Sequence, residues 1–242
     1  MFPISDDNPE PGVPLVTWAL IAACVGVFLL QYSLPASEAE LAVYHYGLIP
    51  GVLFGSVSMQ DAPLPPWGTI ISSMFMHGGL AHLFGNMLYL WIFGDNVELA
   101  MGRVRFLVFY VLTGAAAALT HAVLVPESTI PLVGASGAIS GVLGAYLMLQ
   151  PHGRVRVLIM PFPLILLRTI HVPALVVLGF WFVIQVVSGV LSPVDQAGVA
   201  FWAHVGGFVA GVVFVPFFKR RDVPLFRPVR PRYFDGRRGP WG

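Results

Sequence analysis

The segment Gly134-Ala135-Ser136-Gly137 stands near the start of one apolar stretch, and Ala203-His204-Val205-Gly206-Gly207 stands near the start of another. A serine and a histidine thus lie in segments typical of membrane-spanning helices, where polar groups are costly and usually functional. A serine with a histidine in reach is the smallest set of groups for nucleophilic acyl transfer. The two motifs therefore predict a helical membrane protein with a candidate reactive pair.

The composition is that of a membrane protein. Hydrophobic residues make up 57% of the 242 residues and charged residues only 10%, whereas a soluble domain carries roughly 25% charged residues. Apolar stretches of about 20 residues can cross a bilayer as helices. The predicted spans are Leu15–Tyr32, Thr69–Phe93, Val104–Val125, Leu132–Leu149, Val172–Leu191 and Val199–Phe218. We therefore predict an all-α membrane protein, a bundle of six transmembrane helices.

The basic residues predict how this bundle is oriented. All 13 Lys and Arg residues follow the second, fourth or sixth predicted span. Cytoplasmic loops carry an excess of Lys and Arg, so both termini are predicted to be cytoplasmic and the acidic loop before Pro66 external. The expected organisation is a cytoplasmic N-terminal tail (1–14), a six-helix domain (15–218) and a basic, disordered Pro/Arg-rich tail (219–242).

Two other segments bear on the topology. Asp6, Asp7 and Glu10 precede the first span, and an acidic start is typical neither of a secretory signal nor of a mitochondrial presequence. We therefore expect this span to be retained, in a cell membrane of bacterial type. The segment Val157–Leu167 is apolar, but it is too short to span and contains prolines, so it is predicted to be interfacial or re-entrant.

Closely spaced small residues predict where two helices meet. Gly134, Gly137, Gly141 and Gly144 recur at steps of three, four and three, and Ala203, Gly207 and Gly211 recur at steps of four. Such spacing lets membrane helices approach closely. Ser136 and His204 border these two faces, each about one turn after the predicted start of its helix. Close packing would bring the serine Oγ within hydrogen-bond reach of the imidazole; the alternative is that the glycines serve packing alone.

A second polar pair lies in the predicted second span. His82 and Asn86 are four residues apart, which places them on one face of a helix. Both can donate hydrogen bonds, as a serine nucleophile requires for the developing oxyanion. The alternative is an interhelical pair that holds the bundle together. No acidic residue is placed to orient His204, so the pattern favours a Ser–His dyad over a triad, and we expect neither a metal nor a cofactor.

Taken together, these motifs resemble the rhomboid family of intramembrane serine proteases. The similarity runs from the first span to the sixth. It rests on Gly134-Ala135-Ser136-Gly137, Ala203-His204-x-x-Gly207-x-x-x-Gly211, His82-x-x-x-Asn86 and Gly94-x-x-x-Glu98-x-x-x-Gly102. The resemblance implies that Ser136 is the nucleophile and His204 the general base. It further implies an oxyanion site formed by His82, Asn86 and the backbone N–H of Ser136.

Glu98 and Ser140 have expected roles that differ from those of the four motif residues above. Glu98 falls near the predicted cytoplasmic end, so we expect it to have a structural role only. Ser140 stands where many family members have an aromatic residue packed on the histidine. The ring of His204 is therefore expected to be held by Phe201, Phe208 or a neighbouring helix.

The implied function is endoproteolysis of transmembrane segments near the outer face of the membrane. The expected partners are membrane-protein substrates and the lipid bilayer, with no nucleic acid, and the oligomeric state is open. One alternative is a catalytically inactive relative that binds and escorts membrane proteins. Another is a small transporter or channel with a histidine proton relay, which predicts polar residues through the whole membrane thickness or a repeat.

Overall fold

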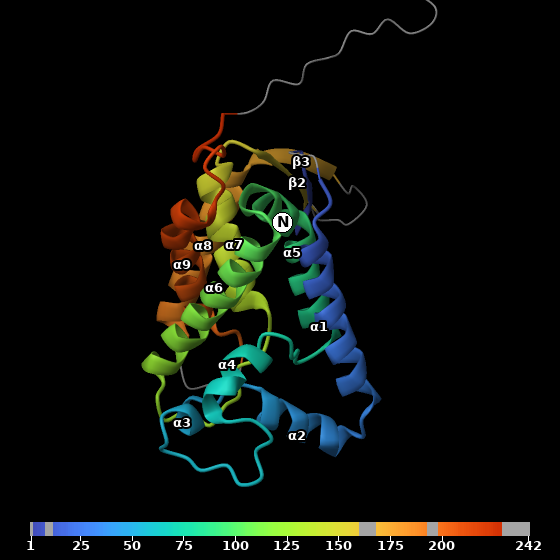
Figure 1. Ribbon diagram of the computed structural model, residues 1–242, viewed down its shortest axis with the longest axis vertical. Helices are drawn as coiled ribbons and strands as arrows, with labels where there is room; N and C mark the ends of the chain where they lie inside the picture. The colour runs from blue at the N-terminus through green and yellow to red at the C-terminus, as the bar shows by residue number, and fades with distance from the viewer. Residues whose placement is uncertain (1, 8–11, 160–167, 193–197, 229–242) are drawn as a thin grey trace, which may run out of the picture.

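The protein is a bundle of long helices with a small sheet at one end (Figure 1). The computed structural model describes residues 2–7, 12–159, 168–192 and 198–228. The long helices are α1 (Leu15–Ser33), α5 (Leu80–Met101), α6 (Arg103–Leu124), α7 (Ser136–Leu149), α8 (Ala174–Leu191) and α9 (Phe201–Phe218). The short helices are α2 (Ala36–Tyr46), α3 (Pro50–Leu53), the 3₁₀ helix η1 (Pro66–Gly68) and α4 (Thr69–Ser72).

The helices carry the apolar surface of an integral membrane protein. Four of them, α1, α6, α8 and α9, are long and apolar enough to cross a membrane, and α7 is a shorter apolar helix. Large apolar side chains are exposed on their outer faces, such as Leu30 (70%), Leu191 (77%) and Phe217 (79%). Lipid is the medium that such a surface requires. Helix α5 is as long as α6, but it contains Asp95 and Glu98.

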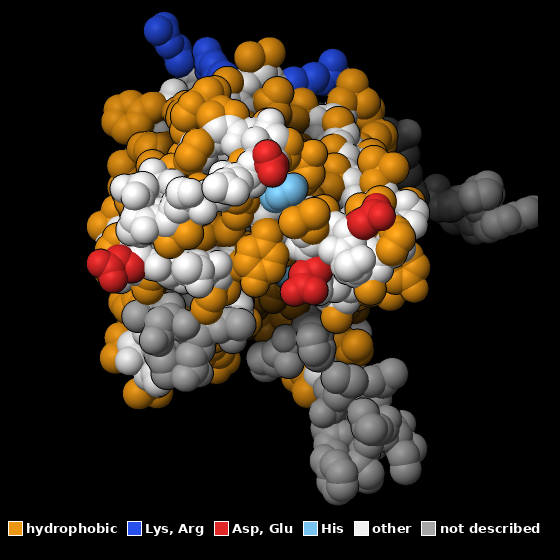
Figure 2. Space-filling view, turned by 90° about the horizontal axis from the view of Figure 1, so that it is seen from below, with side chains coloured by type: hydrophobic (Ala, Val, Ile, Leu, Met, Phe, Trp, Pro, Cys, Tyr) orange, Lys and Arg blue, Asp and Glu red, His pale blue; other side chains and the backbone are white. Residues whose placement is uncertain are grey.

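The two ends of the bundle differ in structure and in charge. The short helices α2, α3 and α4 lie at one end, and the sheet and both ends of the described chain lie at the other (Figure 1). Figure 2 shows the α2–α4 end, where acidic side chains are scattered over the surface and the visible Lys and Arg side chains lie at its far edge.

The protein is mostly helical, as predicted, but it is not all-α, because it also contains a small sheet. The sheet contains β1 (Phe2–Asp6), β2 (Arg154–Ile159) and β3 (Arg168–Pro173), and both neighbouring pairs are antiparallel. The alternation Arg-Val-Arg-Val at the start of β2 buries Val155 and Val157 while the arginines face outward, which is the period of a strand. The segment predicted as re-entrant therefore begins as a strand, and its residues 160–167 lie outside the described ranges.

Buried polar side chains hold β1 in place, so the first residues are not a free tail. The Asp6 carboxylate accepts hydrogen bonds from Asn96 Nδ2 (2.9 Å) on α5 and from Tyr146 Oη (2.7 Å) on α7. Gln150 Nε2 donates to Asn96 Oδ1 (3.2 Å). This network ties the N-terminal strand to two helices of the bundle.

Other predicted boundaries also differ from the structure. The second span does not begin at Thr69: α4 ends at Ser72, and α5 runs from Leu80 to Met101. In the segment predicted to be a disordered tail, the backbone N–H groups of Phe226 and Arg227 donate to carbonyls at the end of α7. This part of the segment therefore packs on the bundle, and residues 229–242 lie outside the described ranges.

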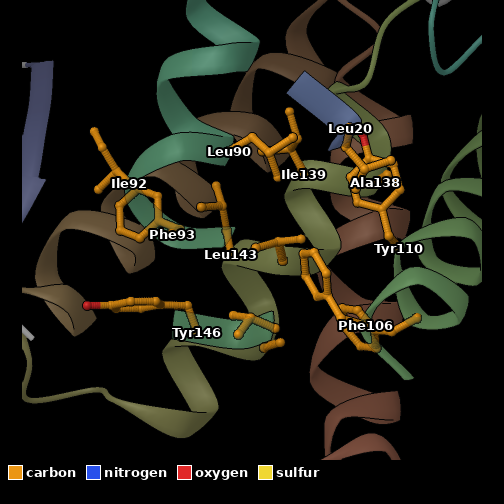
Figure 3. Close-up of a cluster of buried hydrophobic side chains, with 14 of the residues drawn as sticks. Leu20, Leu90, Ile92, Phe93, Phe106, Tyr110, Ala138, Ile139, Leu143 and Tyr146 are labelled. Carbon is orange, nitrogen blue, oxygen red and sulfur yellow. The ribbon is translucent and has the colours of Figure 1, made fainter. Parts of the chain in front are cut away.

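Helix α7 lies at the centre of the core. Ten of its 14 residues are buried, and Figure 3 shows Ile139, Leu143 and Tyr146 among apolar side chains of the surrounding helices. The Tyr146 ring meets the Phe93 ring of α5 edge-on, with centroids 5.0 Å apart. By contrast, only four of the 18 residues of α8 are buried. Side chains presented by α7 are thus held on every side, whereas α8 lies at the periphery.

Glycines bring α7 and α9 into backbone contact. A Cβ built on Gly207 would overlap the carbonyl oxygen of Gly137, and one on Gly211 would overlap that of Gly141. Gly137 and Gly141 themselves face α6, where a Cβ would meet Ala117 and Thr113. Gly144 faces the α9 backbone at Phe208. The glycines of α7 therefore serve two neighbouring helices.

The buried carboxylate of Glu98 joins α5 to the start of α1. It accepts hydrogen bonds from the N–H groups of Val16 (3.0 Å) and Thr17 (2.7 Å) and from Thr17 Oγ1 (2.8 Å). The first N–H groups of a helix have no partner within the helix, and Pro14 provides no side-chain cap. Glu98 therefore acts as a cap supplied by another helix.

We expect Gly207→Val to lower the thermal midpoint of the protein in detergent, because the branched side chain must push α9 away from the Gly137 carbonyl. Overpacking of this kind typically costs about 1–3 kcal/mol. Gly26→Val in α1 is the control, because a Cβ there meets nothing within 4 Å. Equal midpoints for the two variants would contradict the close contact.

Removal of the Glu98 carboxylate should also destabilise the bundle. Glu98→Ala leaves buried N–H groups without an acceptor, a loss of about 1–3 kcal/mol for each group left unsatisfied. The thermal midpoint should fall well below that of Glu127→Ala, which removes an exposed carboxylate. An unchanged midpoint for Glu98→Ala would show that the cap is not needed.

Candidate active site

The loop before α7 sets the position of Ser136. Gly134 has φ +122°, a conformation that glycine adopts without strain, and its N–H donates to Ser73 O (2.9 Å). A Cβ on Gly134 would lie 2.7 Å from the His82 ring. Residues 132–135 therefore belong to this loop, and α7 begins at Ser136 and not at Leu132 as predicted. Ser136 thus lies at the N-terminal end of α7, where helical N–H groups are unpaired.

The structure brings Ser136 and His204 together. His204 lies in the first turn of α9, which begins at Phe201, and its Nε2 is 2.8 Å from Ser136 Oγ. The two residues are 68 positions apart in the sequence. The contact of Gly207 with Gly137, the residue after Ser136, sets the separation of their helices. At this distance a neutral Nε2 can accept the hydroxyl proton.

Helix α8 provides the residues that hold the His204 ring, and sequence reasoning missed both. Gln185 Oε1 lies 2.8 Å from His204 Nδ1, and the Trp181 ring lies against the imidazole with centroids 6.0 Å apart at 33°. Ser140 instead donates to the backbone carbonyl of Ser136 (2.6 Å). The sequence feature that could have identified Gln185 is its amide in the middle of an apolar helix, because such polar groups are costly in a membrane.

His82 and Asn86 face the same cavity as the serine and the histidine. The cavity has a volume of about 540 Å³ and is lined by His82, Asn86, Ser136 and His204, together with Tyr89 and Trp181 among others. Asn86 is buried, and its Nδ2 has no acceptor among the described residues. A buried donor without an acceptor is unfavourable, so this amide is suited to an acceptor that enters with a ligand.

A second histidine, His77, packs against the ring of His82. The rings of His77 and His82 meet edge-on, with centroids 5.2 Å apart. His77 is in the loop before α5, outside the spanning helices, and its Nδ1 lies 3.2 Å from Phe75 O. Burial, together with the nearby His82, lowers the pKa of His77 to about 4. His77 is therefore neutral at pH 7, with Nδ1–H as the donor to Phe75, and serves as a packing partner.

The cavity lies in one half of the bundle. Its lining residues come from the N-terminal parts of α5, α7 and α9, from the loops that precede these helices, and from Trp181 in the middle of α8. These helix starts all point toward the α2–α4 end in Figure 1. The polar groups are thus gathered toward the acidic end of the molecule and away from the sheet.

Comparisons with known proteins agree with this architecture. Residues 65–221 match the family model described as "Rhomboid domain". The chain is 30% identical to Rhomboid protease GluP of Bacillus subtilis over 207 residues, which is 84% of this chain and 34% of that protein. It is 33% identical to Putative rhomboid protease YdcA of the same species over 139 residues, which is 56% of this chain and 62% of that protein.

A shorter match is to a protein named as inactive. Inactive rhomboid protein 1 of Drosophila melanogaster is 35% identical over 80 residues, which is 33% of this chain and 6% of that protein. The chain also spans only about a third of the length of GluP and about three fifths of that of YdcA. The match to the family model covers well over half of the sequence, and the chain belongs to the rhomboid family of membrane proteins.

Proposed function

We propose that the protein is an intramembrane serine endopeptidase with Ser136 as nucleophile and His204 as general base. The observation that carries this proposal is the 2.8 Å contact between Ser136 Oγ and His204 Nε2 in a cavity within an apolar bundle. An activated serine nucleophile is recognised by this geometry, with the base within hydrogen-bond reach and held by a third group.

The reaction follows from the positions of these groups. Ser136 Oγ attacks the substrate carbonyl carbon while His204 Nε2 takes the hydroxyl proton. The intermediate then collapses, the C–N bond breaks, and Nε2 returns the proton to the leaving amine. A water molecule attacks the resulting acyl ester with His204 again as base, which releases the new carboxyl group and restores Ser136.

The proposed oxyanion site uses donors from two helices. Asn86 Nδ2, which lacks an acceptor among the described residues, and the His82 ring approach from α5. The backbone N–H of Ser136 is at the start of α7. Donors held in place before the reaction stabilise the charge that develops on the carbonyl oxygen. The unpaired N–H groups of the α7 N-terminus add a favourable dipole for the same charge.

The proposed substrates are transmembrane segments of other membrane proteins, cleaved near the outer face of the bilayer. A helical substrate hides its carbonyls in its own hydrogen bonds, so the cleaved segment must become extended. Unpaired backbone groups are tolerated at membrane depth only where protein or a water-filled cavity receives them. The cavity beside Ser136 is the proposed place for the extended segment. The proposed setting is six spans, both termini cytoplasmic, in a bacterial-type cell membrane, with no cofactor in the reaction.

We expect Ser136→Ala and His204→Ala each to reduce cleavage of a transmembrane substrate to less than about a tenth of wild type, because neither group of such a pair functions alone. Labelling by a fluorophosphonate should disappear in Ser136→Ala. Ser140→Ala is the comparison and should be far milder, since its hydroxyl bonds a backbone carbonyl. A wild-type protein that is neither labelled nor active would instead support the inactive, substrate-binding alternative.

His82→Ala and Asn86→Ala should lower kcat more than they raise KM, because the oxyanion exists only in the transition state. Loss of one such donor typically reduces the rate by about 10²–10³. The measurement is steady-state cleavage, with the thermal midpoint of each variant recorded alongside. A main effect on KM, or a large fall in the midpoint, would assign these residues to binding or packing.

A further inference from the structure

Gln185 is the polar residue among the buried side chains on the inner face of α8, the face that packs on the bundle. The buried residues of this helix are Ala174, Leu178, Gln185 and Gly189. Gln185 is 6% exposed and the others are apolar or lack a side chain. An amide in this position requires hydrogen-bond partners, because an unsatisfied polar group in a membrane interior is strongly unfavourable.

The hydrogen bonds of Gln185 determine which way its amide faces. Its Nε2 donates to the Trp181 carbonyl one turn earlier (3.4 Å), while Oε1 lies 2.8 Å from His204 Nδ1. The reversed amide would set its oxygen against that carbonyl oxygen, and two acceptors repel. With Oε1 toward the ring, His204 Nδ1 must carry the proton in order to donate.

This bond has a consequence at the opposite side of the ring. A neutral imidazole carries one proton, so protonation of Nδ1 leaves Nε2 with a free lone pair. That nitrogen is the one 2.8 Å from Ser136 Oγ. In the other tautomer, Nε2 would bear a hydrogen and could not accept the hydroxyl proton. A polarised chain thus runs from the Trp181 carbonyl through Gln185 and His204 to Ser136.

We infer that Gln185 is a positioning residue that selects the reactive tautomer of His204, an inference that rests on the proposed protease function. The third group of a Ser–His pair is commonly a carboxylate. A carboxylate at this depth would add a buried charge, which is costly in a membrane. A neutral amide accepts the same Nδ1–H bond without that charge. The Trp181 ring lies beside the imidazole, and Gln185 determines which ring nitrogen carries the proton.

The test compares Gln185→Met with Trp202→Phe in the full-length protein. Methionine is close to glutamine in size and leaves the ring without an acceptor. Trp202→Phe removes a different bond between α8 and α9, from Trp202 Nε1 to the Gly189 carbonyl (3.1 Å), and leaves the Gln185–His204 bond in place. A role in helix packing alone predicts similar effects for the two variants.

Two readouts are needed, the rate of Ser136 labelling by a fluorophosphonate and the ¹⁵N spectrum of labelled histidine, with His204 assigned by its loss in His204→Ala. Wild type and Trp202→Phe should show Nδ1–H with an unprotonated Nε2. Gln185→Met should show the Nε2–H form, with a labelling rate reduced by about tenfold or more and a kcat that falls more than KM changes.

Three results would overturn the inference: an Nδ1–H spectrum in Gln185→Met, a labelling rate that is unchanged despite a change of tautomer, or an equal loss in Trp202→Phe. If the wild-type protein is not labelled at all, the protease proposal fails. The nitrogen spectra then still show whether Gln185 determines the tautomer.

Discussion

The contact between the backbones of α7 and α9 is the constraint on which the rest of the structure depends. Gly207 and Gly211 lie against the carbonyl oxygens of Gly137 and Gly141, with no room for a side chain. Between two membrane helices the hydrophobic effect gives little attraction, so close van der Waals packing has to supply it. The same contact brings the starts of the two helices together and sets the 2.8 Å separation of Ser136 Oγ and His204 Nε2. Stability and site geometry thus depend on the same glycines.

Several polar side chains join one element of the bundle to another. The Glu98 carboxylate of α5 caps α1, and the Asp6 carboxylate of β1 is shared by α5 and α7. Gln185 of α8 reaches His204 of α9. In the cavity, by contrast, Asn86 Nδ2 has no acceptor among the described residues. In a low-dielectric interior such an unmet donor is unfavourable, which is why it supports a role toward a bound substrate.

The helices that meet at the cavity are not held equally. Helix α7 is buried over most of its length, whereas α8 buries one narrow face. Of the helices that line the cavity, the proposed nucleophile is therefore on the most buried one, and the residues that contact the proposed base are on the most exposed one. The contacts of α8 with α9 include the Trp181 ring, the Gln185 amide and the Gly189 carbonyl, which are spaced along one face of α8. The alignment of the His204 ring thus depends on how α8 packs against α9.

Composition and apolar patterning by themselves determined that this is a helical membrane protein. The predicted spans for α1, α6, α8 and α9 differ from the observed helices by at most two residues at either end, because an uninterrupted apolar run of that length has few other stable structures. The spacing of His82 and Asn86 likewise predicted that both would lie on one helix. These are local properties of the chain, and local sequence is enough to specify them.

Only the tertiary structure decided the rest. The place where α7 begins depends on Gly134 fitting against the His82 ring, a contact across 52 positions of sequence. The strand β1 pairs with β2, and its Asp6 binds Asn96 and Tyr146; a charged N-terminal segment alone does not reveal those partners. Gln185 appeared in the sequence as one amide in an apolar helix. Its bond to His204 exists only because the inner face of α8 packs on α9, and such pairing between distant segments is set by packing and not by any local pattern.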